Sequence, residues 1–380
     1  MLGGGPGAFI GAVHRMAARM DGEIELVAGA FSSRPEASAA MGRELYLDPD
    51  RVYDSWEQLL DAEAERAENA ASNPSAAPLD FVAIVTPNGL HYPMARRALE
   101  RGFDVICDKP MTTSLADAED LCRLVTDTGR MFVLTHNYTG YPMVRQARAM
   151  VRAGELGRVR KIVVEYPQGW LSTLLEASGN KQAVWRTDPA MAGPSSALGD
   201  IGTHCENLVH FVTGLEMAEL FADLGSVVIG RDMEDDASLL IHYDGGARGI
   251  LYASQISVGE ENNLTLRVYG ERAALTWRQE HPNQLHLLTS NGPAQVLTRA
   301  SSYLSPEASD ASRLPPGHPE GFIEGFANLY RDAATAFRTR EQGLLPTVQD
   351  GARGMHFIET ALRSSRERQW MDARYTPPGG

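Results

Sequence analysis

Phe81-Val82-Ala83-Ile84-Val85 is a run of five apolar residues, and Thr86, Pro87 and Asn88 follow it directly. An apolar run without alternation is typical of a strand that is buried on both faces of a parallel sheet. The pattern continues with expected helices at 93–101 and 115–128 and expected strands at 105–107 and 131–134. Three alternations of strand and helix predict a doubly wound α/β fold.

A glycine-rich turn stands near the start of the chain, with Gly3, Gly5 and Ala8 in the pattern G-x-G-x-x-A. A helical segment that starts at Phe9 and a strand-like segment at 24–30 follow it. Glycine turn, helix and second strand are the order of a dinucleotide-binding unit. We expect Gly3 to allow the tight turn, Gly5 to let the backbone approach a pyrophosphate, and Ala8 to take the close-packing position, with Phe9 beside them.

The strand that should precede these glycines is almost absent, since only Met1 and Leu2 stand before Gly3. In the usual strand order this strand is central. We therefore expect the natural protein to begin several residues upstream; the alternative is a sheet that lacks most of its middle strand.

The tip of the second strand normally carries an acidic residue that binds the ribose 2′-hydroxyl of NAD. Ser32, Ser33 and Arg34 stand there instead. Small hydroxyls and an arginine suit a 2′-phosphate, so the sequence leans toward NADP while leaving NAD open. The alternative is that Arg34 simply begins the next helix.

Polar residues follow each strand of the first half at its carboxyl end, where doubly wound sheets bind their ligands. His91 comes three residues after Asn88, Asp108-Lys109-Pro110 follows the next strand, and His136-Asn137-Tyr138 follows the third. For His91 and His136 a purely structural role is the alternative. The cofactor contacts expected here are Thr86, Pro87, Asn88, His91, Asp108, Lys109 and Asn137.

After about residue 140 the rhythm changes to alternating strands joined by short turns, which predicts an antiparallel or mixed sheet. We therefore expect a nucleotide-binding domain at 1–139 and a second α/β domain, with a large open sheet, at 140–380. Its expected strands are 159–164, 222–229, 237–243, 249–255, 264–269, 274–277 and 284–288.

Gly199-Asp200-Ile201-Gly202-Thr203-His204 is expected to form the entry from a loop into a helix. At a spacing of four, Asp200 and His204 would share one helical face. A carboxylate beside an imidazole is a common way to hold a general acid/base in one tautomer. The alternative is an aspartate that caps the helix and an unrelated surface histidine.

The composition restricts the class of protein. A net charge of −14 over 380 residues argues against binding to nucleic acid or to anionic membranes. Cys107, Cys122 and Cys205 are widely spaced and odd in number, so we expect core thiols in a cytoplasmic protein, with neither a disulfide framework nor a metal site. No apolar run approaches the ~20 residues of a membrane-spanning helix.

Taken in order, these motifs resemble the glucose-fructose oxidoreductase/inositol dehydrogenase family (Gfo/Idh/MocA), nearly from end to end. Two departures from the family pattern stand out: Asp108 replaces the usual glutamate before the lysine, and Thr139 replaces an arginine that often follows Asn-Tyr. The resemblance is carried by the glycine turn at Gly3, Thr86-Pro87-Asn88, Asp108-Lys109-Pro110, Asn137-Tyr138, Trp185-Arg186 and Gly199-Asp200-Ile201-Gly202-Thr203-His204.

The resemblance implies an N-terminal Rossmann domain, a C-terminal domain whose open sheet supports a homodimer or homotetramer, and NAD(P)-dependent oxidation of a secondary hydroxyl of a sugar or cyclitol. It implies Lys109, Asp200 and His204 as the catalytic set, meeting across a cleft between the two domains. Lys109 would polarise the reacting oxygen, while either Lys109 or His204 would be the formal base. The implied substrate contacts are Lys109, Tyr138, Trp185, Arg186, Asp200, His204 and His318.

Two other functions stay open at this stage. The chain could be a lyase or hydrolase that uses bound NAD for a transient oxidation, or a catalytically silent sensor that binds NAD(P). Net formation of reduced cofactor distinguishes simple oxidation from both.

Overall fold

The computed structural model describes residues 1–69 and 78–379. Within it the chain forms two compact units, and it enters the first unit more than once. Unit 1 consists of 1–135, 326–352 and the C-terminal residues from Pro377. Unit 2 consists of 136–325 and 353–376.

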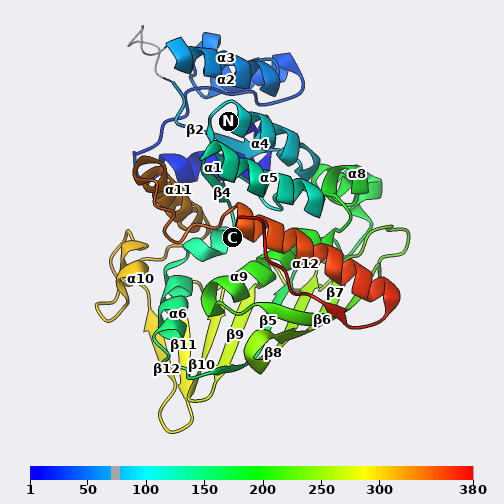
Figure 1. The fold of residues 1–380 in the computed structure, drawn as a ribbon, viewed down its shortest axis with the longest axis vertical. Coiled ribbons are helices and arrows are strands. Elements are labelled where there is room, and N and C mark those ends of the chain that lie inside the picture. Colours follow the sequence, from blue (N-terminus) through cyan, green and yellow to red (C-terminus); the bar gives the residue numbers. More distant parts are fainter. Residues whose placement is uncertain (70–77, 380) are drawn as a thin grey trace. The chain divides into compact units, whose positions relative to one another are not determined.

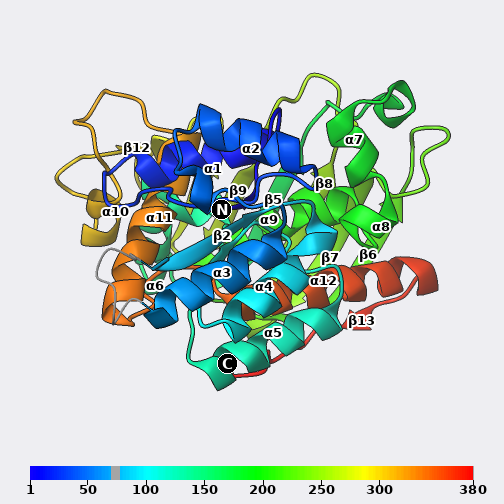
Figure 2. The ribbon, with the colours of Figure 1, turned by 90° about the horizontal axis from the view of Figure 1, so that it is seen from above.

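Unit 1 is built on a four-stranded parallel sheet in the order β1-β2-β3-β4. In Figure 2, α1 and α4 lie on opposite sides of β2, and α5 lies beside α4. The strands are β1 (Leu2–Gly3), β2 (Phe81–Val85), β3 (Asp104–Cys107) and β4 (Phe132–Leu134); the helices are α1 (Phe9–Arg19), α2 (Pro35–Glu44), α3 (Trp56–Asn69), α4 (His91–Glu100), α5 (Leu115–Thr128) and most of α11 (Phe322–Thr339).

The expected strand at 24–30 is wrong, because only its last residues pair. Leu2 forms a single parallel bridge with Ala30, and Gly29 forms another with Val52. The amide of Gly3 donates to the carbonyl oxygen of Ala30, the amide of Ala30 donates to that of Met1, and the amino group of Met1 donates to that of Ala28. Counting these bridges, the order across the sheet is 52, 29–30, β1, β2, β3, β4, and the direction of winding reverses at β1.

Helix α5 shows how local sequence sets the boundaries of an element. Ser114 caps its N-terminus by accepting a hydrogen bond from the amide of Asp117 at 3.2 Å. Gly129 ends it in the left-handed region with φ +64°, which favours glycine. The predicted helix at 115–128 is therefore confirmed, as is the predicted strand at 81–85.

Unit 2 is built on a nine-stranded sheet in the order β12-β11-β10-β9-β5-β8-β7-β6-β13. Its pairs are antiparallel apart from β5 with β8. The strands are β5 (Val159–Pro167), β6 (Met217–Gly225), β7 (Asp236–Tyr243), β8 (Arg248–Ser254), β9 (Thr265–Gly270), β10 (Ala273–Arg278), β11 (Gln284–Thr289), β12 (Gln295–Thr298) and β13 (Met371–Asp372).

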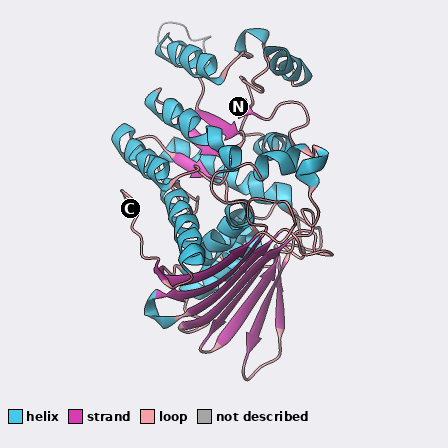
Figure 3. Cartoon of the chain, turned by 90° about the vertical axis from the view of Figure 1, so that its right-hand side faces the viewer, coloured by secondary structure: helices cyan, strands magenta, loops and turns pink. Residues whose placement is uncertain are grey.

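The longer helices of unit 2 gather on one face of this sheet (Figures 1 and 3). Along β7 and β8 buried residues alternate with exposed ones, as a half-buried sheet requires. The other face exposes apolar side chains, among them Leu240, Ile250 and Tyr269. The helices of the unit are α6 (Pro142–Arg152), α7 (Lys181–Arg186), α8 (Pro189–Ala192), α9 (Thr203–Thr213), α10 (Pro306–Asp310) and most of α12 (Val348–Glu367).

The expected strand at 222–229 is displaced, because β6 spans Met217–Gly225. The carboxylate of Asp235 accepts the amide hydrogens of Val227 and Val228 at 2.9 and 3.1 Å. These amides therefore cannot continue the ladder, and the apolar residues beyond them lie in a loop.

The predicted fold class is confirmed: a parallel Rossmann-type sheet is followed by a second domain with a large, mostly antiparallel sheet. The three cysteines are buried and unpaired, as expected for core thiols. In the part of the chain that the structure describes, no helix combines the length and apolarity needed to cross a membrane.

The segment that carries Asp200 and His204 is held by a buried carboxylate from a distant loop. Leu198–Gly202 form one π-helical turn that leads directly into α9. Oε1 of Glu234 accepts hydrogen bonds from Ser195 Oγ and from the amides of Ser196 and Leu198, at 2.6, 2.7 and 3.2 Å. Glu234 therefore caps this turn together with Ser195 Oγ, which accepts a hydrogen bond from the amide of Gly199 at 2.9 Å.

We predict that Glu234→Ala lowers the free energy of unfolding by about 2–5 kcal/mol, because two buried amides lose their acceptor and each costs about 1–3 kcal/mol. Glu234→Gln, which keeps an acceptor oxygen, should lose less. Urea denaturation followed by circular dichroism measures both. Asp223→Ala, which removes an exposed carboxylate from β6, is the control and should be nearly neutral.

The same variants should differ in their dependence on pH. Burial raises the pKa of Glu234 above its ordinary 4.5, even though its hydrogen bonds lower it. The folded chain therefore retains this proton to higher pH than the unfolded chain, and the stability from Glu234 falls as pH rises above about 4.5. As pH rises above about 4.5, the free energy of unfolding of wild type should fall relative to that of Glu234→Gln. If the two proteins showed the same dependence of stability on pH, the raised pKa of Glu234 would be contradicted.

Candidate functional site

The glycine turn after β1 leaves no space for side chains. A Cβ atom on Gly5 would lie 2.5 Å from the carbonyl oxygen of Phe31, and Gly3 has φ +86°. A Cβ on Gly11, one turn into α1, would lie 2.3 Å from Cα of Gly4. The close-packing position expected of Ala8 therefore belongs to Gly11, and Ala8 is instead the residue before α1. The G-x-G-x-x-A pattern did not identify Gly11, because this glycine lies three residues beyond the Ala8 that the pattern selected.

The start of α1 can receive an anionic group. No side chain caps it, and its first turn holds no acidic residue. The amides of a helix N-terminus, together with the helix dipole, favour a phosphate there. The sheet reverses its winding at β1, which is where open α/β sheets bind ligands. Gly3, Gly5 and the start of α1, with Phe9 exposed at its first residue, thus fit a dinucleotide pyrophosphate.

The residues after the paired segment at 29–30 remain exposed. The amide of Arg34 donates to Ser32 Oγ at 3.2 Å, and Arg34 is the residue before α2. Both Ser33 and Arg34 are exposed. Within the described residues, the guanidinium of Arg34 has no hydrogen bond or ion pair, so it is available to a ligand.

His91 connects two loops at the carboxyl edge of the sheet. Its Nδ1 lies 2.8 Å from the carbonyl oxygen of Pro110, and its Nε2 lies 2.9 Å from that of Thr86. The ring is fully buried, and burial lowers its pKa. These contacts favour the structural role that the sequence left open, because both ring nitrogens face backbone carbonyl oxygens, to one of which a neutral ring donates. Asn88, in the same loop, is also buried.

Asp108 and Lys109 follow β3 directly, before a cis peptide bond to Pro110. Oδ1 of Asp108 accepts a hydrogen bond from Thr135 Oγ1 at 2.8 Å. Burial alone would raise the pKa of Asp108, but His14 and the charge of Lys109 outweigh it and lower that pKa below its ordinary value. Asp108 is therefore an anion beside the lysine.

In unit 2, Asp200 is held by two side chains. Its Oδ2 accepts hydrogen bonds from Arg186 Nε at 3.2 Å and from Gln255 Nε2 at 2.9 Å. Asp200 does not cap the helix, since the amides there bind Glu234. The alternative interpretation of Asp200 as a cap is therefore wrong, and His204 is buried rather than on the surface.

Aromatic rings surround His204. The ring of Tyr138 lies 4.8 Å from it and that of His136 lies 5.4 Å from it, both edge-on. The hydroxyl groups of Tyr138 and Tyr166 share a hydrogen bond, and Tyr166 donates to Asn262. Burial raises the pKa of Tyr138 to about 12, so its hydroxyl keeps its proton at neutral pH.

Two buried side-chain amides near this cluster have an atom without a partner in the described part of the chain, namely Nδ2 of Asn137 and Oε1 of Gln255. Turning the amide of Gln255 would not help, because Nε2 must face the carboxylate of Asp200. Buried polar atoms are rarely left unpaired unless a ligand or an ordered water completes them. Gln255 was missed because it stands in no recognisable motif.

Arg186 stacks on the ring of Trp185, with its guanidinium carbon 4.1 Å from the ring centroid. Arg186 thus donates a hydrogen bond to Asp200, while Trp185 presents an aromatic surface. His318 lies in an exposed loop, and its carbonyl oxygen accepts from Arg299. Burial raises the pKa of Cys205, which keeps it a thiol and argues against a nucleophilic role.

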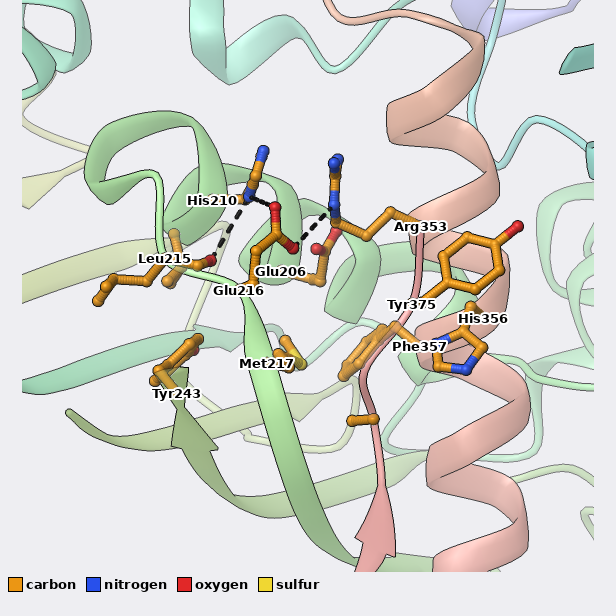
Figure 4. Close-up of a pocket in the computed structure, with 12 residues that line it drawn as sticks. Glu206, His210, Leu215, Glu216, Met217, Tyr243, Arg353, His356, Phe357 and Tyr375 are labelled. Carbon is orange, nitrogen blue, oxygen red and sulfur yellow. Dashed lines mark hydrogen bonds and ion pairs between the residues drawn. The ribbon is translucent and has the colours of Figure 1, made fainter. Parts of the chain in front are cut away.

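A pocket drawn in Figure 4 lies at the other end of α9 and contains none of the predicted site residues. His210 Nδ1 and Arg353 Nε lie 3.5 and 3.4 Å from the carboxylate of Glu216. These contacts attach the end of α9 and the start of α12 to Glu216, the residue before β6. Among the described residues, no group of three or more His, Cys, Asp or Glu could hold a metal ion.

The structure therefore brings the predicted residues together in two sets. The set in unit 1 surrounds the carboxyl edge of the parallel sheet: Gly3, Gly5, Ala8, Phe9, Ser32, Ser33, Arg34, Thr86, Pro87, Asn88, His91, Asp108 and Lys109. The set in unit 2 comprises Asn137, Tyr138, Trp185, Arg186, Asp200, His204 and, away in its loop, His318. The roles of both sets remain predictions.

Known proteins share this architecture. The chain is 32% identical over 378 residues to an uncharacterized oxidoreductase, YfiI, of Bacillus subtilis, covering 97% of this chain and 94% of that protein. An oxidoreductase structure from Sinorhizobium meliloti is 46% identical with a TM-score of 0.86, covering 98% of both chains. An inositol dehydrogenase homolog from Azotobacter vinelandii in complex with NAD⁺ is 36% identical with a TM-score of 0.92, covering 98% of this chain and 96% of that one.

The same Azotobacter protein has also been solved with NADH and myo-inositol, at 35% identity and a TM-score of 0.88, with the same coverage. Residues 3–138 match the oxidoreductase family with an NAD-binding Rossmann fold, and residues 144–276 match the GFO/IDH/MocA C-terminal domain. The chain belongs to the GFO/IDH/MocA family of NAD(P)-dependent oxidoreductases.

Proposed function

We propose that this protein oxidises a secondary hydroxyl group of a sugar or cyclitol, with NAD(P)⁺ as the hydride acceptor. The observation that carries the proposal is the arrangement around Asp200: Gln255 donates to the carboxylate and leaves its own Oε1 without a donor. A polyol hydroxyl is a donor of the kind that this oxygen lacks. The relative that binds myo-inositol supports the same class of substrate.

The residues of unit 1 fit the cofactor. Gly3 and Gly5 leave the backbone open to a pyrophosphate, and Thr86, Pro87 and Asn88 form the next loop along the edge of the sheet. When bound, NAD(P)⁺ supplies the hydride acceptor. Lys109 ends the neighbouring strand, where its ammonium group polarises the reacting oxygen. Asn137, with an unpaired amide donor, contacts cofactor or substrate.

The acid–base chemistry belongs to unit 2. His204 takes the proton of the substrate hydroxyl, and the rings of Tyr138 and His136 fix the plane of its imidazole. Asp200, held by Arg186 and Gln255, holds a neighbouring hydroxyl or orients His204. Trp185 offers an aromatic face to the sugar ring. Lys109 is the competing candidate for the formal base.

We predict net formation of reduced nicotinamide with myo-inositol or with one of a panel of sugars and inositols, read at the nicotinamide absorbance. Lys109→Ala should abolish turnover and leave cofactor affinity nearly unchanged, because its contact is with the reacting oxygen. His204→Ala should reduce kcat by about 10²–10⁴-fold and flatten the alkaline rise of the rate profile. Asp200→Asn should fall between these or raise KM.

His281→Ala, a substitution at an exposed histidine, is the control and should retain full activity. Near-normal turnover of His204→Ala would assign the base to Lys109. If all three variants were folded and kept normal turnover, the dehydrogenase proposal would be overturned. Consumption of substrate without net formation of reduced cofactor would indicate a lyase or hydrolase. If substrate were not consumed and no reduced cofactor formed, the protein would be a sensor.

We further propose that Ser32, Ser33 and Arg34 receive the adenosine end of the cofactor and that Arg34 binds a 2′-phosphate. The two Azotobacter structures hold NAD⁺ or NADH, so binding of NADP⁺ rests on the exposed guanidinium of Arg34, which has no partner among the described residues, and on the lack of an acidic residue beside it.

Titration by intrinsic fluorescence should therefore show NADP⁺ binding at least as tightly as NAD⁺. Arg34→Ala should weaken NADP⁺ by about tenfold, as expected for the loss of one charge-assisted contact, and leave NAD⁺ unchanged. Arg43→Ala, on α2 and away from the strand tip, is the matched control. A clear preference of wild type for NAD⁺ would contradict this proposal.

The exposed apolar face of the unit 2 sheet is proposed to bind a second copy of the chain. Leu240, Ile250, Tyr269, Leu288 and Val296 are each at least 38% exposed on β7, β8, β9, β11 and β12. Contiguous exposed apolar residues mark interaction surfaces.

Light scattering should show a homodimer or homotetramer that Leu240→Glu and Ile250→Glu together convert to monomer. Val258→Glu, at an exposed apolar residue in a loop, should leave the assembly intact. A wild-type monomer would refute the proposed interface.

A further inference from the structure

A chain of three polar side chains, two of them buried, ends at Asp108, the residue before Lys109. His14 of α1 has Nδ1 2.7 Å from the hydroxyl oxygen of Tyr330 of α11, and its Nε2 lies 3.8 Å from Oδ1 of Asp108. His14 is fully buried, and Tyr330 is 2% exposed. The ring of Phe326 packs against His14 with centroids 5.0 Å apart. All four residues belong to unit 1.

Two contacts of His14, with Tyr330 at Nδ1 and with Asp108 at Nε2, favour one tautomer of its ring. Burial, with a further contribution from the charge of Asp108, raises the pKa of Tyr330, so the hydroxyl keeps its proton. In the described part of the chain, Nδ1 of His14 is the acceptor within reach of that hydroxyl. A neutral imidazole has one donor and one acceptor nitrogen, so accepting at Nδ1 places the proton on Nε2.

The Nε2–H group then faces a carboxylate whose orientation is already set. Thr135 donates to Oδ1 of Asp108, the same oxygen that Nε2 approaches. A separation of 3.8 Å is too long for a direct hydrogen bond, so the contact is electrostatic. It is nevertheless effective, because His14 is fully buried and its N–H group points to an Asp108 carboxylate that is only 13% exposed.

We propose that Tyr330 and His14 are positioning residues: Tyr330 holds His14 as the Nε2–H tautomer, and His14 holds the Asp108 carboxylate and thereby the segment that presents Lys109. Asp108 and Lys109 are thus supported by His14 and Tyr330, two residues that lie on different helices and are 316 positions apart in sequence. The inference rests on the proposed role of Lys109, but its first test does not depend on turnover.

The first test is the tautomer of His14 in the full-length protein. Two-bond ¹H–¹⁵N spectra of protein labelled at histidine distinguish Nδ1–H from Nε2–H rings, and His14→Asn assigns the signal among the ten histidines. The proposal expects an Nε2–H ring in wild type. Tyr330→Phe, which removes one oxygen, should shift the ring toward Nδ1–H or a mixture.

Tyr53→Phe is the matched control, because it removes another tyrosine hydroxyl of unit 1 whose partner is Glu63. It should leave the signals of His14 unchanged. An Nδ1–H ring in wild type, or identical His14 signals in wild type and Tyr330→Phe, would overturn the proposal.

The second test asks whether the chain positions the segment after β3. Tyr330→Phe and His14→Asn should each weaken NAD⁺ binding, measured by fluorescence, by about three- to tenfold, whereas Tyr53→Phe should not. His14→Gln, whose amide is longer than that of Asn and can donate toward Asp108, should recover part of the loss. Equal NAD⁺ affinity in all variants would show that the contact does not position this segment. Because both readouts are independent of substrate, failure of the proposed dehydrogenase activity alone would leave them intact.

Discussion

The contact between Gly4 and Gly11 is the constraint on which unit 1 depends. With no side chain on either residue, the first full turn of α1 lies directly against the turn that follows β1. This approach points the uncapped start of α1 at the edge of the sheet. It also sets the rotation of α1 so that His14, three residues later, faces inward to Asp108 and Tyr330. One steric requirement thus shapes both the phosphate site and the support behind Lys109.

Unit 2 depends on a different constraint: the carboxylate of Asp200 and the imidazole of His204 must be held in place within a largely buried region. Burying charge is costly unless every charged atom has partners. Asp200 receives two donors, and Glu234 receives three from the preceding turn. The neighbouring Asp235 binds Arg231 and two loop amides. Residues 234–235 therefore fix both the helical turn of Asp200 and the end of β6.

Features set by local sequence were predicted well. The apolar run at 81–85 and the serine and glycine that bound α5 are determined by residues that are close in sequence, and the structure reproduces them. The carboxyl-end position of Asp108 and Lys109 followed from the same strands. The errors arose where distant residues decide: the segment at 24–30 pairs only through single bridges to Leu2 and Val52, and β6 ends early because Asp235 takes two of the amides that would extend it.

In the candidate site, too, the residues with a local sequence signal were predicted and those placed by distant contacts were not. Asp200 and His204 were found because their spacing is itself a signal, yet apart from Arg186 and Ser195 most of their support comes from positions far away in sequence. Gln255, Glu234 and the ring of Tyr166 come from positions 30 or more residues away, in stretches with no motif. A D-x-x-x-H pair grafted onto another helix would keep the spacing and lose these contacts. The helix would then lack the donors that hold Asp200 and the rings that fix His204. The chemical competence of the pair therefore belongs to the packing of unit 2 rather than to the motif, and a substitution at Gln255 should affect Asp200 more than many changes closer to it in sequence.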